Sequence, residues 1–163
     1  ANSLEETNLI SLIADAFTKK GDFESAMKHI DHAINRTGTD NFKFQKATIY
    51  MKMNQHENAI SIFTELIDES TYNREVFSRR ATSYMATKQY DDAKADYEKL
   101  QVFWPDAPGI YLNLAQIAEA KGQSSEALKN YELYLKYADP QSIPTEELKQ
   151  VRTRMEQLQG SKL

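Results

Sequence analysis

Histidine and acidic side chains are the residues of this chain best suited to chemistry, and their spacing argues against a catalytic site. His56-Glu57 begins like the zinc-binding pattern H-E-x-x-H, but Ile60 occupies the position of the second histidine. Asp91 and Asp92 are adjacent, so they do not share a helix face and make a poor acid/base pair. The 5 glycines are too scattered to cradle a phosphate, and no G-x-S-x-G motif presents a nucleophilic serine. We therefore expect a protein that is not an enzyme and needs no cofactor.

His29 and His32 are the remaining candidates for a metal site. They are three residues apart, which places both on one face of a helix, but no third ligand accompanies them. Each lies beside an apolar position, Ile30 or Ala33, and this predicts that both histidines face solvent on the outside of the helix. The chain has no cysteine, so it has no disulfide, thiolate nucleophile or cysteine-based zinc site. We expect no metal.

Composition excludes further classes of partner. The chain has 163 residues with 20 basic and 24 acidic side chains, a net charge of −4 that does not suit a general nucleic-acid binder. No apolar run approaches the length of a bilayer span, so we expect no direct insertion into a membrane. A bacterial periplasm or cell envelope and a cytoplasm fit equally well. The terminal Ser161-Lys162-Leu163 matches a peroxisomal address, but three common residues can match by chance, and we do not expect them to act as one.

The elements that position any site are revealed by two ladders of alanine. In each ladder the spacings are 33, 34 and 34 residues, and the first ladder precedes the second by 12. The first ladder is Ala14, Ala47, Ala81 and Ala115; the second is Ala26, Ala59, Ala93 and Ala127. Four places after the second ladder come Ile30, Phe63, Tyr97 and Tyr131. Because residues four apart meet on one helix face, each alanine marks a close helix contact beside a large residue.

Turn and cap residues divide each unit into two antiparallel helices. The turns are expected at Gly21-Asp22, Asn54-Gln55, Lys88-Gln89 and Gly122-Gln123. Asp40, Asn73 and Asp106 are predicted to cap the helices that open units two to four, and Pro108 suits a first helical turn.

This pattern resembles the tetratricopeptide repeat, a helix–turn–helix unit of 34 residues with small residues at positions 8 and 20. On that frame the repeats are 7–40, 40–73, 74–107 and 108–141. Leu66, Leu100 and Tyr134 depart from the pattern because they are bulky at position 27. The resemblance implies an all-α fold: a right-handed superhelix of four repeats plus a C-terminal capping helix, in a single domain over 1–163.

The capping helix is predicted over 145–159. Its apolar stripe consists of Leu148, Val151, Met155 and Leu158, with charged residues elsewhere. A repeat array leaves an apolar face uncovered at its end, and such a helix covers it. The alternative is that this stripe pairs two subunits in a homodimer.

The resemblance also implies a concave groove lined by the first helix of each repeat. The groove residues carried over to this chain are mainly polar and uncharged, with a few apolar anchors. The principal ones are Ser11, Asp15, Phe44, Gln45, Thr48, Met51, Ser78, Arg79, Thr82, Met85, Leu112, Asn113 and Gln116. Equivalent positions hold Asn8, Leu12, Thr18, Lys19, Asn41, Lys52, Glu75, Ala86, Glu119 and Ala120. Amide and hydroxyl groups can bond an extended peptide backbone, and methionines accept varied side chains. We expect a protein or peptide partner.

One known ligand type of the family is not expected. The family's carboxylate clamp, which grips the acidic C-termini of large chaperones, uses lysine and asparagine at positions 5 and 9 of its first repeat. This chain has Ser11 and Asp15 there.

Lys43, Lys46, Arg79 and Arg80 concentrate positive charge on two neighbouring first helices. They could dock an acidic segment or a carboxylate. Alternatively, acidic second helices neutralise them while their stems cover apolar surface.

The sequence therefore predicts a non-catalytic protein-interaction scaffold that binds a partner segment in its groove. Two alternatives remain: an oligomerisation or structural module that uses its ends and capping helix, and a regulatory repeat domain of a larger enzyme or envelope lipoprotein.

Overall fold

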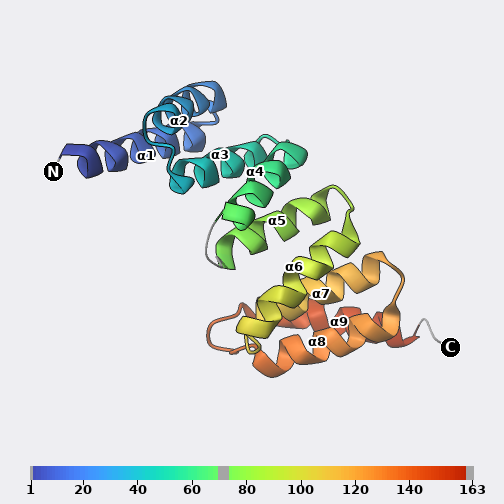
Figure 1. The fold of residues 1–163 in the computed structure, drawn as a ribbon. Coiled ribbons are helices and arrows are strands. Elements are labelled where there is room, and N and C mark those ends of the chain that lie inside the picture. Colours follow the sequence, from blue (N-terminus) through green and yellow to red (C-terminus); the bar gives the residue numbers. More distant parts are fainter. Residues whose placement is uncertain (1, 70–73, 161–163) are drawn as a thin grey trace. The chain divides into compact units, whose positions relative to one another are not determined.

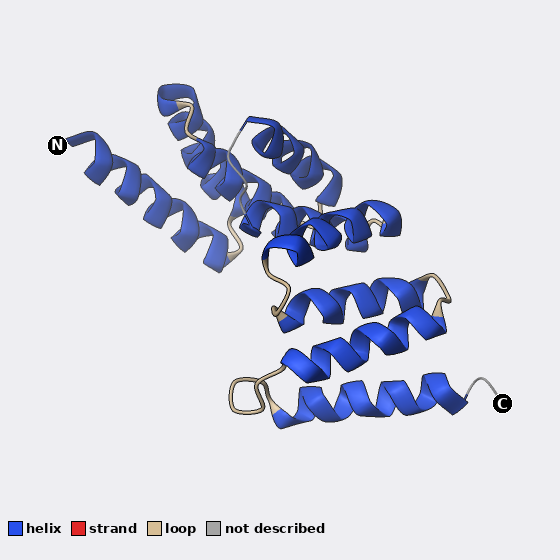
Figure 2. Ribbon diagram, turned by 60° about the horizontal axis from the view of Figure 1, so that its bottom comes forward, coloured by secondary structure: helices blue, strands red, loops and turns tan. Residues whose placement is uncertain are grey.

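The computed structural model of this protein describes residues 2–69 and 74–160, and these residues form nine α-helices and no strand (Figures 1 and 2). The helices are α1 (Asn2–Lys20), α2 (Phe23–Thr37), α3 (Asp40–Lys52), α4 (His56–Glu69), α5 (Arg74–Ala86), α6 (Tyr90–Phe103), α7 (Pro108–Ala120), α8 (Ser124–Tyr137) and α9 (Thr145–Gly160). The predicted all-α repeat class is confirmed. Asn73 and Ser161-Lys162-Leu163, which carried a predicted cap and a predicted address, lie outside the described residues.

The chain forms two compact units, Ala1–Lys88 and Gln89–Leu163. In the first unit α1 packs on α2, α2 on α3, α3 on α4 and α4 on α5. In the second, α6 packs on α7, α7 on α8 and α8 on α9. The boundary falls inside the third predicted repeat, 74–107, so the assignment of 1–163 to one domain stays a prediction.

The two alanine ladders form the centre of the packing in each unit. All eight alanines are at most 1% exposed, and the large residues that follow the second ladder are buried beside them. Leu66, Leu100 and Tyr134, which depart from the family pattern, are only 1–2% exposed. These bulky side chains therefore fill the core, where each contributes roughly 1.5–3 kcal/mol through burial.

The helix starts differ in part from the prediction. Asp40 is the first residue of α3 rather than its cap, which is Thr39, and the cap of α7 is Ala107 rather than Asp106. Neither cap residue bonds the helix through its side chain. Pro108 lies in the first turn of α7 as predicted. Its fixed φ favours the first helical position, so α7 begins at Pro108, one residue later than it would with Asp106 as its cap.

The C-terminal helix α9 packs on α8, which confirms the predicted capping helix. Val151 is buried in a cluster with Tyr111, Tyr131 and Tyr134, and the rest of the apolar stripe packs around it. The Tyr134 hydroxyl donates to Glu147 Oε1 of α9 at 2.7 Å. The stripe is thus mostly covered within its own unit, and pairing of two subunits through it stays a prediction.

Candidate functional site

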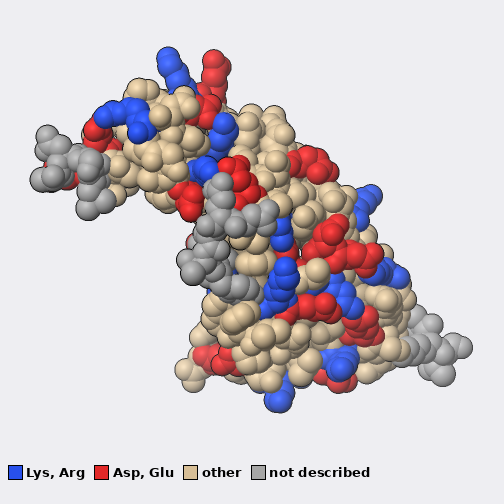
Figure 3. All heavy atoms as spheres, viewed as in Figure 1, with Lys and Arg blue, Asp and Glu red and all other residues tan. Residues whose placement is uncertain are grey.

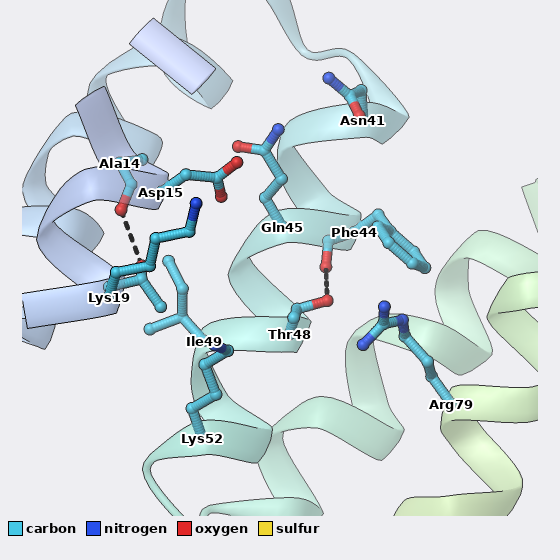
Figure 4. A pocket seen from close by; sticks show the side chains of 11 residues that line it. Ala14, Asp15, Lys19, Asn41, Phe44, Gln45, Thr48, Ile49, Lys52 and Arg79 are labelled. Atoms are coloured by element: carbon cyan, nitrogen blue, oxygen red, sulfur yellow. Dashed lines mark hydrogen bonds between the residues drawn. The ribbon is translucent and has the colours of Figure 1, made fainter. Parts of the chain in front are cut away.

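A pocket of about 300 Å³ opens among the first helices of the first unit, between α1, α3 and α5 (Figure 4). Most of its lining residues occupy positions that the sequence predicts for the groove. They are Ala14, Asp15, Thr18, Lys19, Asn41, Phe44, Gln45, Thr48, Ile49, Lys52 and Arg79. The first unit therefore brings predicted groove residues from three repeats to one site.

Helix α3 supplies the middle of the pocket because its polar residues recur every three or four places. Asn41, Gln45, Thr48 and Lys52 share one face of the helix, and Phe44 lies beside them. Other side chains of α3, such as Phe42 and Ala47, are fully buried in the core. Core burial on one side of α3 thus fixes which residues the helix presents to the pocket.

Two hydroxyls of the pocket bond their own helix. Thr48 Oγ1 donates to the Phe44 carbonyl oxygen at 3.0 Å, and Thr18 Oγ1 donates to the Ala14 carbonyl oxygen at 2.7 Å (Figure 4). Because the protons are used within the helix, these threonines can offer a ligand only the lone pairs of their oxygens.

Arg79 and Phe44 form one wall of the pocket. The Arg79 guanidinium lies 5.2 Å from the centroid of the Phe44 ring, and its Nη2 bonds Glu75 Oε1 at 2.8 Å. Phe44 packs against Phe63 with ring centroids 5.8 Å apart. Contacts on both sides hold the aromatic wall in place, and the glutamate neutralises much of the arginine charge.

The opposite wall carries charged side chains that the pocket leaves available and an amide that is already engaged in part. The side chains of Asp15, Lys19 and Lys52 make no hydrogen bond or ion pair with the part of the chain that the structure describes. The Gln45 Nε2 group donates to Ser11 Oγ and so joins α3 to α1, while Gln45 Oε1 is buried without a partner there. Figure 4 shows the side chains of Asp15, Lys19 and Gln45 all turned toward the space between α1 and α3.

Several predicted groove residues lie outside this pocket. Ser11 contacts it only through Gln45, and Met51 packs at the edge of the core cluster around Phe63. Ser78, Thr82 and Met85 are on α5 away from the lining, and Thr82 Oγ1 donates to the Ser78 carbonyl oxygen. Leu112, Asn113 and Gln116 belong to α7 of the second unit, and the Asn113 amide donates to the Gly109 carbonyl oxygen at 2.6 Å.

Ala14 and Ile49 line the pocket without having been predicted to do so. Both are buried, at 1% and 3% exposure, and so form its floor. The repeated spacing of Ala14 predicts a close contact between helices. A small residue at such a contact lies deep between the helices, and this is where the floor of the pocket is. For Ile49 the sequence offers one indication of its place in the pocket, namely that it directly follows the predicted groove residue Thr48.

The four residues of the predicted basic patch are all engaged. Lys43 pairs with Glu65 and Lys46 with Asp31, each at 2.6 Å, and Arg79 pairs with Glu75. Arg80 donates to Thr64 Oγ1 at 3.0 Å and lies over the rings of Phe77 and Tyr84. On the face shown in Figure 3, basic and acidic atoms are likewise interspersed. The lysines pair with acids of the second helices α2 and α4, as in the alternative, whereas the acid beside Arg79 lies on its own helix α5. Docking through the patch stays a prediction.

The two histidines of α2 have different surroundings. His29 stacks on Phe17 of α1 with ring centroids 5.5 Å apart, so the predicted solvated position is wrong for this residue. His32 is exposed as predicted. Within 2–69 and 74–160, no three His, Cys, Asp or Glu side chains gather in a way that could hold a metal ion, and no helix is long and apolar enough to cross a membrane.

Comparison with known proteins adds the family. Two models of the tetratricopeptide repeat match the chain, one over residues 41–71 and one over residues 78–143. A search of curated protein sequences finds no match.

Three solved structures illustrate the similarity of this fold to known helical repeat proteins. A tetratricopeptide repeat protein from Parabacteroides merdae is 16% identical with a TM-score of 0.79, covering 94% of this chain and 60% of that one. A MamA RS-1 double mutant is 14% identical with a TM-score of 0.74, covering 95% of both chains. The translocator chaperone SycD of Yersinia enterocolitica is 21% identical with a TM-score of 0.68, covering 74% of this chain and 83% of that one. At these identities the likeness concerns the fold alone. With its helix pairs, its buried alanine ladders and the two family matches, the chain belongs to the tetratricopeptide repeat family.

Proposed function

We propose that this protein is a non-catalytic scaffold that binds a peptide, or an extended segment of a partner protein, in the pocket of its first unit. The observation that carries the proposal is the lining of that pocket: the amide of Asn41 and the second N–H of the Gln45 amide beside an apolar surface at Phe44 and Ile49. Amides bond the backbone of an extended chain, and an apolar surface accepts a side chain. A volume of about 300 Å³ suits a few residues of a longer segment.

Packing makes the pocket ready for a ligand before one arrives. Gln45 joins α3 to α1, and Arg79 is held between Glu75 and Phe44. A partner that binds such a surface pays for ordering its own residues but little for ordering the scaffold. SycD, which has a similar fold, is described as a translocator chaperone, and this general class of protein partner is consistent with the proposal.

The test is selection of peptides from a displayed random library on the purified protein. We expect enriched peptides whose binding is lost in the double variant Phe44→Ala/Arg79→Glu. The matched control is Lys28→Glu, which changes an exposed charge on α2 and should keep binding. Circular dichroism checks that all three proteins are equally folded. Enriched peptides that bind the double variant as well as the wild type would place the binding surface elsewhere.

A further inference from the structure

The pocket has an unsatisfied positive end and an apolar end, and the distance between them specifies a ligand. We infer that it selects partner segments in which an acidic side chain stands three or four residues from an apolar one. The inference rests on the proposed function and adds the chemical class and spacing of the segment.

The positive end consists of Lys19 and Lys52, near the C-termini of α1 and α3. Several other basic side chains of the first unit have acidic partners: Arg36 bonds Glu6, Lys43 bonds Glu65 and Lys46 bonds Asp31. Lys20 and Lys28 also lack an ion pair with the described residues, but they lie outside the pocket. Lys19 and Lys52 are exposed, line the pocket and make no ion pair with any residue that the structure describes. On a chain with a net charge of −4, two such lysines in a concave site attract an acidic group locally.

The apolar end of the pocket consists of Phe44 on α3, while Leu12 of α1 lies just outside the lining. Leu12 is 66% exposed, and it shares a helix face with Asp15 and Lys19, three and seven residues further on. On α3, Phe44 precedes Lys52 by eight residues. Both helices thus place an apolar side chain before a lysine by nearly the same number of residues.

This separation converts into a spacing along the ligand. At a rise of about 1.5 Å per residue, seven or eight residues of helix cover roughly 10–12 Å. An extended chain advances about 3.3–3.6 Å per residue, so three or four residues of ligand cover the same distance. Asp15 lies between the two ends and repels an acid placed there, which confines the acidic residue to the lysines.

The acid is expected to be a side chain rather than a chain terminus. Lysine ammonium groups are mobile point charges that accept a carboxylate from varied directions. The fork of Arg79, which could hold a terminal carboxylate with two bonds, is already occupied by Glu75. The ligand is therefore an internal segment with Asp or Glu at one position and Leu, Ile, Met or Phe three or four positions away.

The test uses peptides selected from the displayed library on the wild-type protein, aligned for residue spacing. The consensus peptide is then synthesised with a fluorescent label, with a free or amidated C-terminus and with its acid replaced by the matching amide. We expect the dissociation constant, measured by fluorescence anisotropy, to rise about tenfold in Lys19→Gln/Lys52→Gln and to stay within about twofold in the control Lys20→Gln/Lys28→Gln. Replacing the acid in the peptide should cost the same factor, and amidation should cost nothing.

Three outcomes would overturn the inference. Peptides that depend on Phe44 but show no acidic residue at this spacing would leave the proposed function standing and remove the inference alone. Peptides that bind only with a free C-terminus would assign the lysines to a terminal carboxylate. An absence of any Phe44-dependent peptide would contradict both the inference and the proposed function.

Discussion

Lys88 adopts a left-handed backbone conformation. In two of the other three turns the equivalent residue is a glycine. The φ values are +79° at Gly21, +59° at Asn54, +61° at Lys88 and +71° at Gly122, at spacings of 33, 34 and 34 residues. One residue in each helix–turn–helix must therefore take this conformation, whatever its type. A side chain with a Cβ atom is strained in this conformation, and asparagine is strained less than lysine.

Two glycines in the second unit test this requirement, because their replacement by alanine should change the free energy of unfolding in opposite directions. Gly122→Ala should lower the free energy of unfolding by roughly 1 kcal/mol because alanine is strained at φ +71°. Gly109→Ala should raise it by about 0.5 kcal/mol because Gly109 lies in helix α7. An added Cβ meets no atom within 4 Å at either position, so the backbone alone sets the sign. Urea denaturation of both variants measures the difference; equal signs would contradict the explanation.

Two buried tyrosines of the second unit give a prediction at alkaline pH. Burial, reinforced by hydrogen bonds to Glu119 and Glu147, raises the pKa of Tyr131 and of Tyr134 to about 12. The folded state holds these protons more tightly than the unfolded chain, whose tyrosines titrate near 10. Their contribution to stability is therefore complete below about pH 10 and is lost as the pH rises toward 12.

The variant Tyr134→Phe should lose less stability than the wild type between about pH 9.5 and 11.5, because phenylalanine cannot ionise. Urea midpoints at the two pH values measure the loss, and absorbance at 295 nm follows the titration directly. The control is Tyr137→Phe, whose hydroxyl makes no hydrogen bond with the described residues. Identical alkaline losses in the wild type and Tyr134→Phe would refute the role of this hydroxyl.

Among the elements, α9 shows how a single buried side chain holds a helix in place. Val151 is 6% exposed and is the one fully buried member of the apolar stripe, whose other members are partly buried. Val151→Asp should lower the free energy of unfolding by about 2 kcal/mol or more, because an unpaired charge cannot stay in that cluster. The matched control Gln150→Asp adds the same charge at an exposed neighbour and should change stability by less than about 0.5 kcal/mol. Thermal melts compare the two, and equal melting temperatures would show that α9 does not depend on this contact.

The elements of the fold could be predicted because their signals are local and repeated. Ala47 and Ala81 were placed in the core from spacing alone, and α9 from its apolar stripe. The helix starts at Asp40 and Pro108 were missed by a residue, because a cap depends on the exact backbone path and a nearby proline changes it.

The candidate site could be predicted only in part, because its details depend on pairs of residues far apart in the sequence. Lys43 and Glu65 are 22 residues apart, and Lys46 and Asp31 are 15 apart, so no local pattern shows that they neutralise one another. The same holds for the availability of Lys19 and Lys52, which depends on which acids come within reach. The positions of the groove residues could be carried over from the family. Which of their charges remain unpaired depends on the three-dimensional arrangement of the helices.

At the scale of the whole molecule, the division into two units conflicts with a division into repeats. The division between the compact units falls between Lys88 and Gln89 in the sequence. The third predicted repeat, in contrast, ends at 107. A helix of the third repeat, α6, thus belongs with the second unit, where α6 packs on α7. Tyr97 and Leu100 of α6 are each 2% exposed in the whole chain, so this helix is anchored by burial as well as by its packing on α7.

Fragments cut at the two boundaries decide between them. We expect the fragment 89–163 to be helical and to unfold cooperatively, because it keeps the whole of the second unit. The fragment 108–163 should be less stable by several kcal/mol, since it loses helix α6 and leaves the surface of α7 that α6 covers exposed to water. Circular dichroism melts of both fragments, with 1–88 and the full chain for reference, measure the order. If 89–163 is unfolded while the full chain melts in one transition, the unit boundary has no independent stability and the prediction of a single domain over 1–163 is supported instead.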